Sequence, residues 1–162
     1  NILAAGSPAL IDRVEPLFDV IGSRTWRMGE APEQANVVKI IGNYLIVCAI
    51  QSLGEAVSLG ESAGVDPGAL VELLNATMFP GQVYGGYGAL IAERRYRPAG
   101  FSATLGRKDL GLALDVARAG GVRLPIGEIA RAALDDLITR GHGDDGWAAI
   151  AEAKRPGPPG GA

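Results

Sequence analysis

The feature that most constrains this chain is a long segment with helical character, from Pro32 to Ala63. Between Val37 and Val57, apolar residues occur on nearly every side of the helix that this segment would form. A helix of this kind is stable only where other helices or a second subunit cover it. The sequence therefore predicts a mainly α fold built around this helix. The short flanking helices offer too little cover, so we expect a homodimer or a higher assembly.

The charge and the apolar pattern argue against two classes of partner. The stretch from Ile40 to Ile50 is interrupted by Asn43 and followed by Gln51 and Glu55, so we expect it to be too short and too polar to span a membrane. The net charge is -3 at pH 7, and the Lys and Arg residues form no basic cluster. This argues against binding to nucleic acid.

Residues that bind metals or form disulfides are scarce. The chain has one histidine, His142, and one cysteine, Cys48, and no carboxylates cluster at the spacing of metal ligands. We therefore predict that there is no metal site. Cys48 lies within an apolar run and cannot form an internal disulfide, which is compatible with a cytoplasmic location.

The N-terminal residues have the pattern of a strand, a helix and a second strand. A short apolar run ends at Gly6, Ser7-Pro8 is a typical helix start, and the helix is expected from Pro8 to Val20. Residues 23–28 then alternate with a period of two. Such a βαβ unit needs neighbouring strands, and the chain begins within the first strand without a methionine, so we expect it to be a fragment.

After the long helix the pattern remains helical. Asp66 and Pro67 predict the start of a further helix, to about Ala76. We expect an irregular turn over residues 78–88, including Tyr84 to Gly88 as an elbow between helices and not a phosphate loop. Further helices are expected over residues 87–94, 105–119, 125–140 and 146–154, with a loop over 97–101 and a disordered tail over 156–162.

Three stretches of the chain carry a family resemblance. Residues 36–43 contain Lys39-x-x-x-Asn43, residues 101–112 read FSATLGRKDLGL, and residues 141–150 form a third segment rich in Gly and Asp. Together they resemble the β-hydroxyacid dehydrogenase family, which includes 3-hydroxyisobutyrate dehydrogenase and is related to 6-phosphogluconate dehydrogenase. The resemblance implies an all-helical domain like the C-terminal domain of 6-phosphogluconate dehydrogenase over residues 29–155. Residues 1–28 would then be the C-terminal remnant of a Rossmann-type NAD(P)-binding domain.

The same resemblance implies an NAD- or NADP-dependent oxidoreductase that interconverts a small hydroxyacid and its semialdehyde or keto form. Two features depart from the family pattern. Glu33-Gln34-Ala35 replaces the usual G-x-G turn before the lysine, and the G-x-G-x-x-G dinucleotide fingerprint is absent from the sequence. We therefore expect that this chain alone neither binds dinucleotide tightly nor turns over substrate.

Lys39 and Asn43 are the candidate catalytic pair. They are four residues apart, so on a helix both project from one face and can reach a single ligand. The ammonium group of Lys39 can donate a proton to a developing alkoxide and take it back in the oxidative direction, while Asn43 orients the same oxygen and binds substrate. The alternative is that Lys39 extends along an apolar helix towards water and that Asn43 is a buried polar group satisfied by the neighbouring turn.

Phe101, Lys108 and Asp109 are the other candidates. By resemblance, Lys108 approaches the cofactor near its nicotinamide, and Asp109 binds in the substrate site by pairing with a cation there, such as Lys39. Phe101, which we expect to be exposed in a loop, would cover the substrate or the nicotinamide. The alternatives are that the helix dipole alone explains Asp109 and that Phe101 anchors its loop to the core.

Two other functions remain open at this point. One is a non-enzymatic helical dimerisation module that retains the family motif, and the other is a relative of the imine reductases. Imine reductases usually replace the catalytic lysine, so the presence of Lys39 favours carbonyl or alcohol chemistry.

Overall fold

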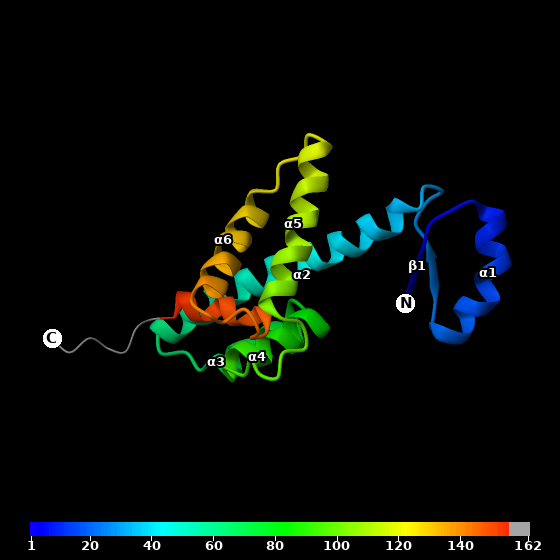
Figure 1. Ribbon diagram of the computed structural model, residues 1–162. Coiled ribbons are helices and arrows are strands. Elements are labelled where there is room, and N and C mark those ends of the chain that lie inside the picture. Colours follow the sequence, from blue (N-terminus) through cyan, green and yellow to red (C-terminus); the bar gives the residue numbers. More distant parts are fainter. Residues whose placement is uncertain (156–162) are drawn as a thin grey trace. The chain divides into compact units, whose positions relative to one another are not determined.

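A computed structural model describes residues 1–155 of the chain (Figure 1). The chain divides into two units, Asn1–Asn43 and Tyr44–Ala162, and each is described by itself. The tail that we expected to be disordered, residues 156–162, lies outside the described residues. The boundary that we expected after residue 28 stays a prediction.

The first unit contains the predicted strand, helix and strand. Strand β1 spans Ile2–Ala4, helix α1 spans Pro8–Ile21, and strand β2 spans Thr25–Arg27. The two strands are parallel, with Leu3 opposite Trp26. The pairing confirms the βαβ pattern that we inferred from the sequence. Two short strands cover little of the helix, and four large apolar side chains of α1 are exposed: Leu10, Leu17, Val20 and Ile21.

The long helix α2 spans Glu33–Ser62, close to the predicted limits of Pro32 and Ala63. Among the described residues it is the one helix that by length and composition alone could cross a membrane. Our expectation that it is too short and too polar is therefore wrong, because that argument considered only residues 40–50 and the apolar helix is longer. Within the second unit, however, α2 forms the centre of a packed core, and its Val47 and Ile50 are fully buried.

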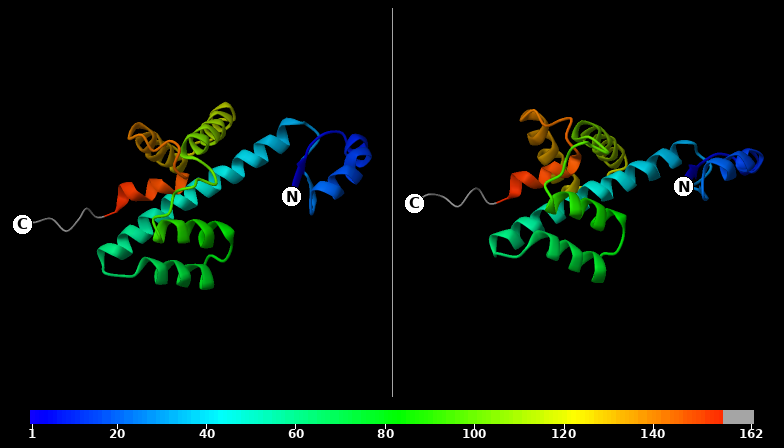
Figure 2. Two further views of the ribbon diagram at one scale, coloured as in Figure 1. Left: turned by 60° about the horizontal axis from the view of Figure 1, so that its bottom comes forward. Right: turned by 90° about the horizontal axis from the view of Figure 1, so that it is seen from below.

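In the second unit, the other helices lie on two sides of α2. Figure 2 shows α3 and α4 on one side and α5 and α6 on the other. The elements are α3 (Pro67–Thr77), the π-helical turn η1 (Val83–Tyr87), α4 (Gly88–Ala92), α5 (Ala103–Ala119), α6 (Pro125–Thr139) and the 3₁₀ helix η2 (Trp147–Lys154). The mainly α fold with a short βαβ unit is thereby confirmed.

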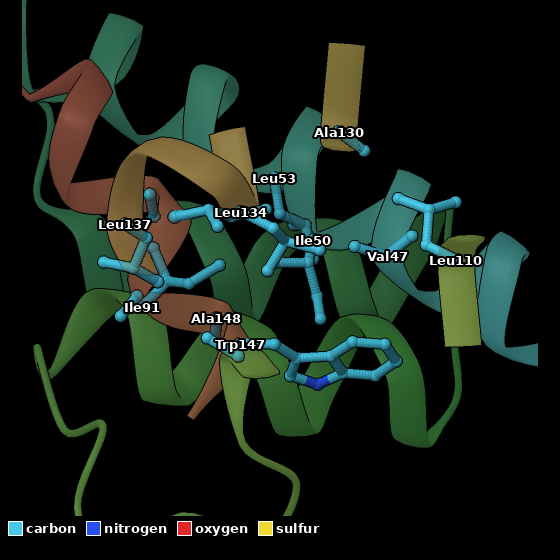
Figure 3. Packing of buried hydrophobic residues seen from close by; sticks show 14 of the residues in the cluster. Val47, Ile50, Leu53, Ile91, Leu110, Ala130, Leu134, Leu137, Trp147 and Ala148 are labelled. Carbon is cyan, nitrogen blue, oxygen red and sulfur yellow. The ribbon is translucent and has the colours of Figure 1, made fainter. Parts of the chain in front are cut away.

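The core of the second unit is the cluster of side chains between these layers (Figure 3). Its largest fully buried members come from α2, α4, α5, α6 and η2: Val47, Ile50, Val57, Ile91, Leu110, Leu134 and Ile150. Each such side chain contributes about 1.5–3 kcal/mol to folding when it leaves water. The helices of this unit are therefore held together by one shared apolar core.

Two predicted boundaries differ from the structure. Residues 83–87, which we expected to be part of an irregular turn, form the π-helical turn η1 that continues into α4. Gly85 fits here because a Cβ at this position would approach the Asn75 side chain to 2.9 Å, so this glycine allows close packing on α3 and does not make an elbow. Helix α5 begins two residues earlier than predicted, because the Ser102 hydroxyl accepts a hydrogen bond from the Leu105 amide.

Close contact between α2 and η2 leads to a test of the packing. A Cβ added at Gly54 would lie 2.9 Å from the Cα of Ala151, which is a backbone atom that cannot move alone. We expect Gly54→Ala to lower the free energy of unfolding by about 1–3 kcal/mol, as overpacking does. Urea denaturation followed by circular dichroism measures this.

The matched control is Gly42→Ala on the same helix, where an added Cβ meets no atom within 4 Å. Alanine favours a helix over glycine by about 1 kcal/mol, so this variant should be as stable as the unmodified chain or more so. Equal effects of the two substitutions would contradict the close packing of Gly54.

Candidate functional site

Lys39 and Asn43 both lie on α2, as the sequence predicted. Lys39 is exposed and Asn43 is half-buried. The helix is continuous across both positions, so the spacing of four residues places their side chains on one face. This arrangement allows one small ligand to contact both.

Phe101 immediately precedes the N-cap residue of α5. It is half-buried, so our expectation of an exposed position is wrong. Its ring meets the ring of Trp147 edge-on, with 4.8 Å between the ring centroids, and this packing contributes about 0.5–1.5 kcal/mol beyond the buried area. This packing ties the Phe101 loop to the core, and the ring also lines a pocket, so both the substrate role and the anchoring role of Phe101 stay predictions.

Lys108 and Asp109 lie on α5 in contrasting environments. The side chain of Lys108 is 67% exposed, whereas Asp109 is buried, and the Lys108 Nζ lies 3.7 Å from an Asp109 carboxylate oxygen. Asp109 lies beyond the first turn of α5, where the effect of the helix dipole has already declined. The dipole alone therefore does not explain this residue. A carboxylate is costly to bury, which favours a specific role for Asp109.

The loop that carries Phe101 is tied to the segment before η2 by backbone hydrogen bonds. The Trp147 amide donates to the Phe101 carbonyl at 3.1 Å, and the Ala103 amide donates to the Asp145 carbonyl at 2.8 Å. The Gly146 amide donates to the Tyr96 carbonyl at 2.9 Å. These bonds fix the position of Phe101 relative to α5.

The Asp145 carboxylate reinforces the same junction. It forms an ion pair with Arg97 and accepts a hydrogen bond of 2.9 Å from the Nδ1 of His142. Burial raises the pKa of the Asp145 carboxyl, but the hydrogen bonds from Arg97 and His142 outweigh it, and the pKa is lowered overall. The His142 side chain is about half exposed, so the contact with Asp145 forms at the surface of the second unit.

Asp145, Arg97 and Trp147 were not among the candidates from the sequence. Arg97 and Asp145 are 48 residues apart, so no local spacing connects them. Residues 147–151 form an apolar run, and this pattern could have indicated that Trp147 is buried.

Phe101 and Trp147 also form part of the wall of an open pocket in the second unit. Its volume is about 630 Å³, and its other walls come from α2, η1, α4, residues 95–100 and the residues beside Trp147. Among residues 1–155, no group of three or more His, Cys, Asp or Glu side chains could hold a metal ion. The exposed ammonium of Lys108 is a group that could contact a negatively charged cofactor.

The chain matches a family model. The model is described as NAD-binding of NADP-dependent 3-hydroxyisobutyrate dehydrogenase, and it covers residues 34–153. This range contains Lys39, Asn43, Phe101, Lys108 and Asp109.

Curated relatives are similar along almost the whole chain. An uncharacterized oxidoreductase, YfjR of Bacillus subtilis, is 34% identical over 150 residues, which are 93% of this chain and 52% of that protein. Glyoxylate/succinic semialdehyde reductase 1 of Arabidopsis thaliana is 29% identical over 94% of this chain and 52% of its own length. The chain therefore spans about half the length of the curated relatives it matches.

Solved structures share the fold. The crystal structure of 3-hydroxyisobutyrate dehydrogenase from Salmonella typhimurium superposes with a TM-score of 0.83 at 23% identity, covering 92% of this chain and 52% of that one. The Mycobacterium tuberculosis 3-hydroxyisobutyrate dehydrogenase gives a TM-score of 0.80 at 22% identity, covering 94% of this chain and 54% of that one.

The Asp145 junction leads to a prediction about pH. A carboxylate whose pKa is lowered by folding stabilises the protein above its unfolded pKa of about 3.9, and this contribution is lost as the pH falls through the folded value. We expect Asp145→Asn to reduce the free energy of unfolding at pH 7 by about 1–2 kcal/mol. The loss of stability on acidification should also become less steep. Urea denaturation between pH 7 and pH 3 measures both effects.

The neighbouring Asp144 is exposed and provides a matched control. Asp144→Asn should change the free energy of unfolding by less than about 0.5 kcal/mol, as is usual for surface substitutions. If both variants behaved alike at every pH, the stabilising role of the Asp145 junction would be refuted.

Proposed function

The chain belongs to the 3-hydroxyisobutyrate dehydrogenase family, and we propose on this premise that it is the helical half of a cytoplasmic NAD(P)-dependent oxidoreductase. Its reaction is the interconversion of a small hydroxyacid and its semialdehyde or keto form. The observation that carries this proposal is that one family model spans all five candidate residues. The names of relatives agree in reaction type, since one is a glyoxylate/succinic semialdehyde reductase and another a 2-(hydroxymethyl)glutarate dehydrogenase.

In this proposal Lys39 is the acid and base of the reaction. When bound, the nicotinamide cofactor supplies or accepts the hydride. Lys39 donates a proton to the oxygen of the carbonyl as negative charge develops on it, and recovers the proton in the oxidative direction. Asn43, one turn further along α2, orients the same oxygen by donating a hydrogen bond from its amide.

The three residues of the second unit have supporting roles. Lys108, which is exposed at the surface of α5, contacts the cofactor near its nicotinamide. Asp109 is buried and acts as a fixed negative charge that pairs with a cation of the substrate site. Phe101 shields bound substrate from water, and the contact with Trp147 holds its ring in place.

The assembly in this proposal is a homodimer or higher. Three large side chains along α2 are exposed by about half or more: Ile41 at 48%, Leu45 at 59% and Leu59 at 71%. Their spacing of 4 and 14 residues places them along one side of the helix, where the exposed Ser52 and Glu55 lie between Leu45 and Leu59. A second copy of the chain would cover this apolar stripe.

Lys39→Ala tests the proposed reaction. In the full-length protein, assayed with a panel of hydroxyacids and both cofactors, we expect turnover to fall by about 100-fold or more, the scale of general acid–base catalysis. Cofactor binding, measured by fluorescence titration of NADH and NADPH, should remain within about twofold, because Lys39 acts on the substrate.

The exposed Arg123 on the loop before α6 provides a control, and Arg123→Ala should keep full turnover. Full activity of the Lys39→Ala variant would disprove the role of Lys39. Absence of turnover in the unmodified full-length protein with every substrate would instead favour the non-enzymatic dimerisation module.

The apolar stripe on α2 is tested by light scattering. We expect the unmodified protein to be a dimer or higher, and the double variant Leu45→Glu with Leu59→Glu to dissociate, because a charged group is costly to bury in an apolar interface. The circular dichroism spectrum should be unchanged, since both side chains are exposed in the single chain. A monomeric unmodified protein would rule out this assembly.

A further inference from the structure

The pocket beside Phe101 has walls of mainly apolar character. Ile46 of α2, Tyr87 of η1, Leu90 of α4 and the rings of Phe101 and Trp147 line it. Phe101 belongs to the substrate site in the proposed function, so a ligand in this pocket would contact a residue already assigned to substrate. The chemistry of the walls therefore bears on which substrate the protein accepts.

The charge in the pocket wall argues against a second anionic group on the substrate. Arg95 lines the pocket, and its guanidinium forms an ion pair with Glu93 at 2.9 Å. A carboxylate, sulfonate or phosphonate placed in an apolar pocket requires a cation as a partner. An acidic group in the pocket would have to compete with Glu93 for Arg95, the one cation among the lining residues, whereas an uncharged occupant would not, so the pocket favours an uncharged occupant.

One buried polar atom in the wall points to a ligand. Trp147 is only 3% exposed, and its indole nitrogen has no hydrogen-bond partner among the described residues. In Figure 3 this nitrogen is on the edge of the ring that faces away from Val47 and Ile50. A buried donor without a partner is unfavourable, and an oxygen acceptor from a bound molecule would satisfy it. Because this nitrogen is closed to solvent, a neighbouring side chain would have to move to admit that acceptor. The rings of Tyr87 and Phe101 both lie edge-on to the indole, with 5.9 Å and 4.8 Å between ring centroids.

The pocket also has room that the chain itself does not fill. Gly86 lies in its wall, on the π-helical turn η1, and a Cβ added there would meet no atom within 4 Å. π-helical turns are rare and are frequent at functional sites. A larger side chain at the exposed Gly86 can therefore be added at the edge of the pocket without displacing the core.

We propose that this pocket binds the substituent that the hydroxyacid carries beyond its reacting carbon, and that this substituent is an uncharged, mainly apolar chain with an oxygen acceptor for Trp147. The inference rests on the proposed function, because it assigns the ligand to the substrate through Phe101. It differs from that function in naming the class of substrate: hydroxyacids with an extended apolar substituent, with no second acidic group.

The test is a series of 2-alkyl-3-hydroxypropionates, assayed with the full-length protein, in which the alkyl group lengthens from methyl to butyl. We expect kcat/KM to rise by roughly tenfold or more across the series, because three added methylene groups leave water. A substrate that carries a carboxymethyl group in place of butyl should be at least tenfold poorer than the butyl compound. A flat series, or a preference for the carboxymethyl compound, would overturn the inference.

Gly86→Leu tests whether the preference arises in this pocket. The leucine should make kcat/KM for the butyl compound no higher than kcat/KM for the methyl compound, because it takes up space that the added methylene groups would use. The matched control is Ala89→Leu on α4, which lines a different hollow beside Val71 and Asn75 and should keep the preference. Equal preference in Gly86→Leu and in the unmodified protein would contradict the assignment.

Trp147→Phe tests the acceptor. A 2-(2-methoxyethyl) substituent has the shape of butyl but places an ether oxygen in the chain. We expect Trp147→Phe to lower kcat/KM for the methoxyethyl compound several-fold more than kcat/KM for the butyl compound, because only the methoxyethyl compound loses a hydrogen bond. An equal loss for both compounds would show that Trp147 contributes shape alone and would overturn this part of the proposal.

A binding measurement separates failure of the inference from failure of the proposed function. Trp26→Phe leaves Trp147 as the one tryptophan of residues 1–162, and replacing any tryptophan in the rest of the full-length protein by phenylalanine makes its fluorescence report on the pocket. Titration with 2-butyl-3-hydroxypropionate should change the emission, and Gly86→Leu should abolish that change. Such binding without turnover of any substrate would disprove the proposed dehydrogenase activity and leave the proposed ligand pocket standing. Turnover without a change in Trp147 emission would disprove the proposed pocket alone.

Discussion

The second unit depends on the burial of one face of α2. Val47, Ile50, Leu53 and Val57 recur every three or four residues, and each is almost fully removed from water. Helices from both sides and η2 pack onto this face, which explains why a single long helix can position elements that are far apart in sequence. Leu45 and Leu59 are exposed on the opposite side of the same helix. The apolar residues that the sequence shows on nearly every side of α2 therefore belong to two surfaces, one buried in the core and one exposed.

The elements that local rules determine were predicted well. Asp66 and Pro67 predicted the start of α3, and the Asp66 carboxylate does accept a hydrogen bond from the Ala69 amide at 2.8 Å. Where tertiary contacts decide the backbone, the sequence was insufficient. The turn η1 has glycine residues that locally suggest a loop, yet stacking of Phe79 on Tyr84 at 4.6 Å and close packing on α3 hold it in helical form.

The candidate site shows the same limit. Spacing alone connected Lys39 with Asn43, and the other three candidates came from resemblance to a family. The residues that hold the Phe101 loop could not be found in this way, because Arg97 meets Asp145 across 48 residues of chain. Burial of Asp109 was also unpredictable, since it follows from the packing of α5 against the core and not from the polar residues beside it.

Trp147 links these features, because one side chain serves the core, the Phe101 loop and the pocket. Its ring packs with buried residues of α2, its amide donates a hydrogen bond to the Phe101 carbonyl, and its buried indole nitrogen has no partner within residues 1–155. A change of specificity made at Trp147 therefore also reduces stability. A substitution at Gly86 should not reduce stability in this way, since Gly86 faces open space and contributes no side chain to the core. Substrate preference in a protein of this design can consequently change through η1 while the core that supports Phe101 and α5 stays intact.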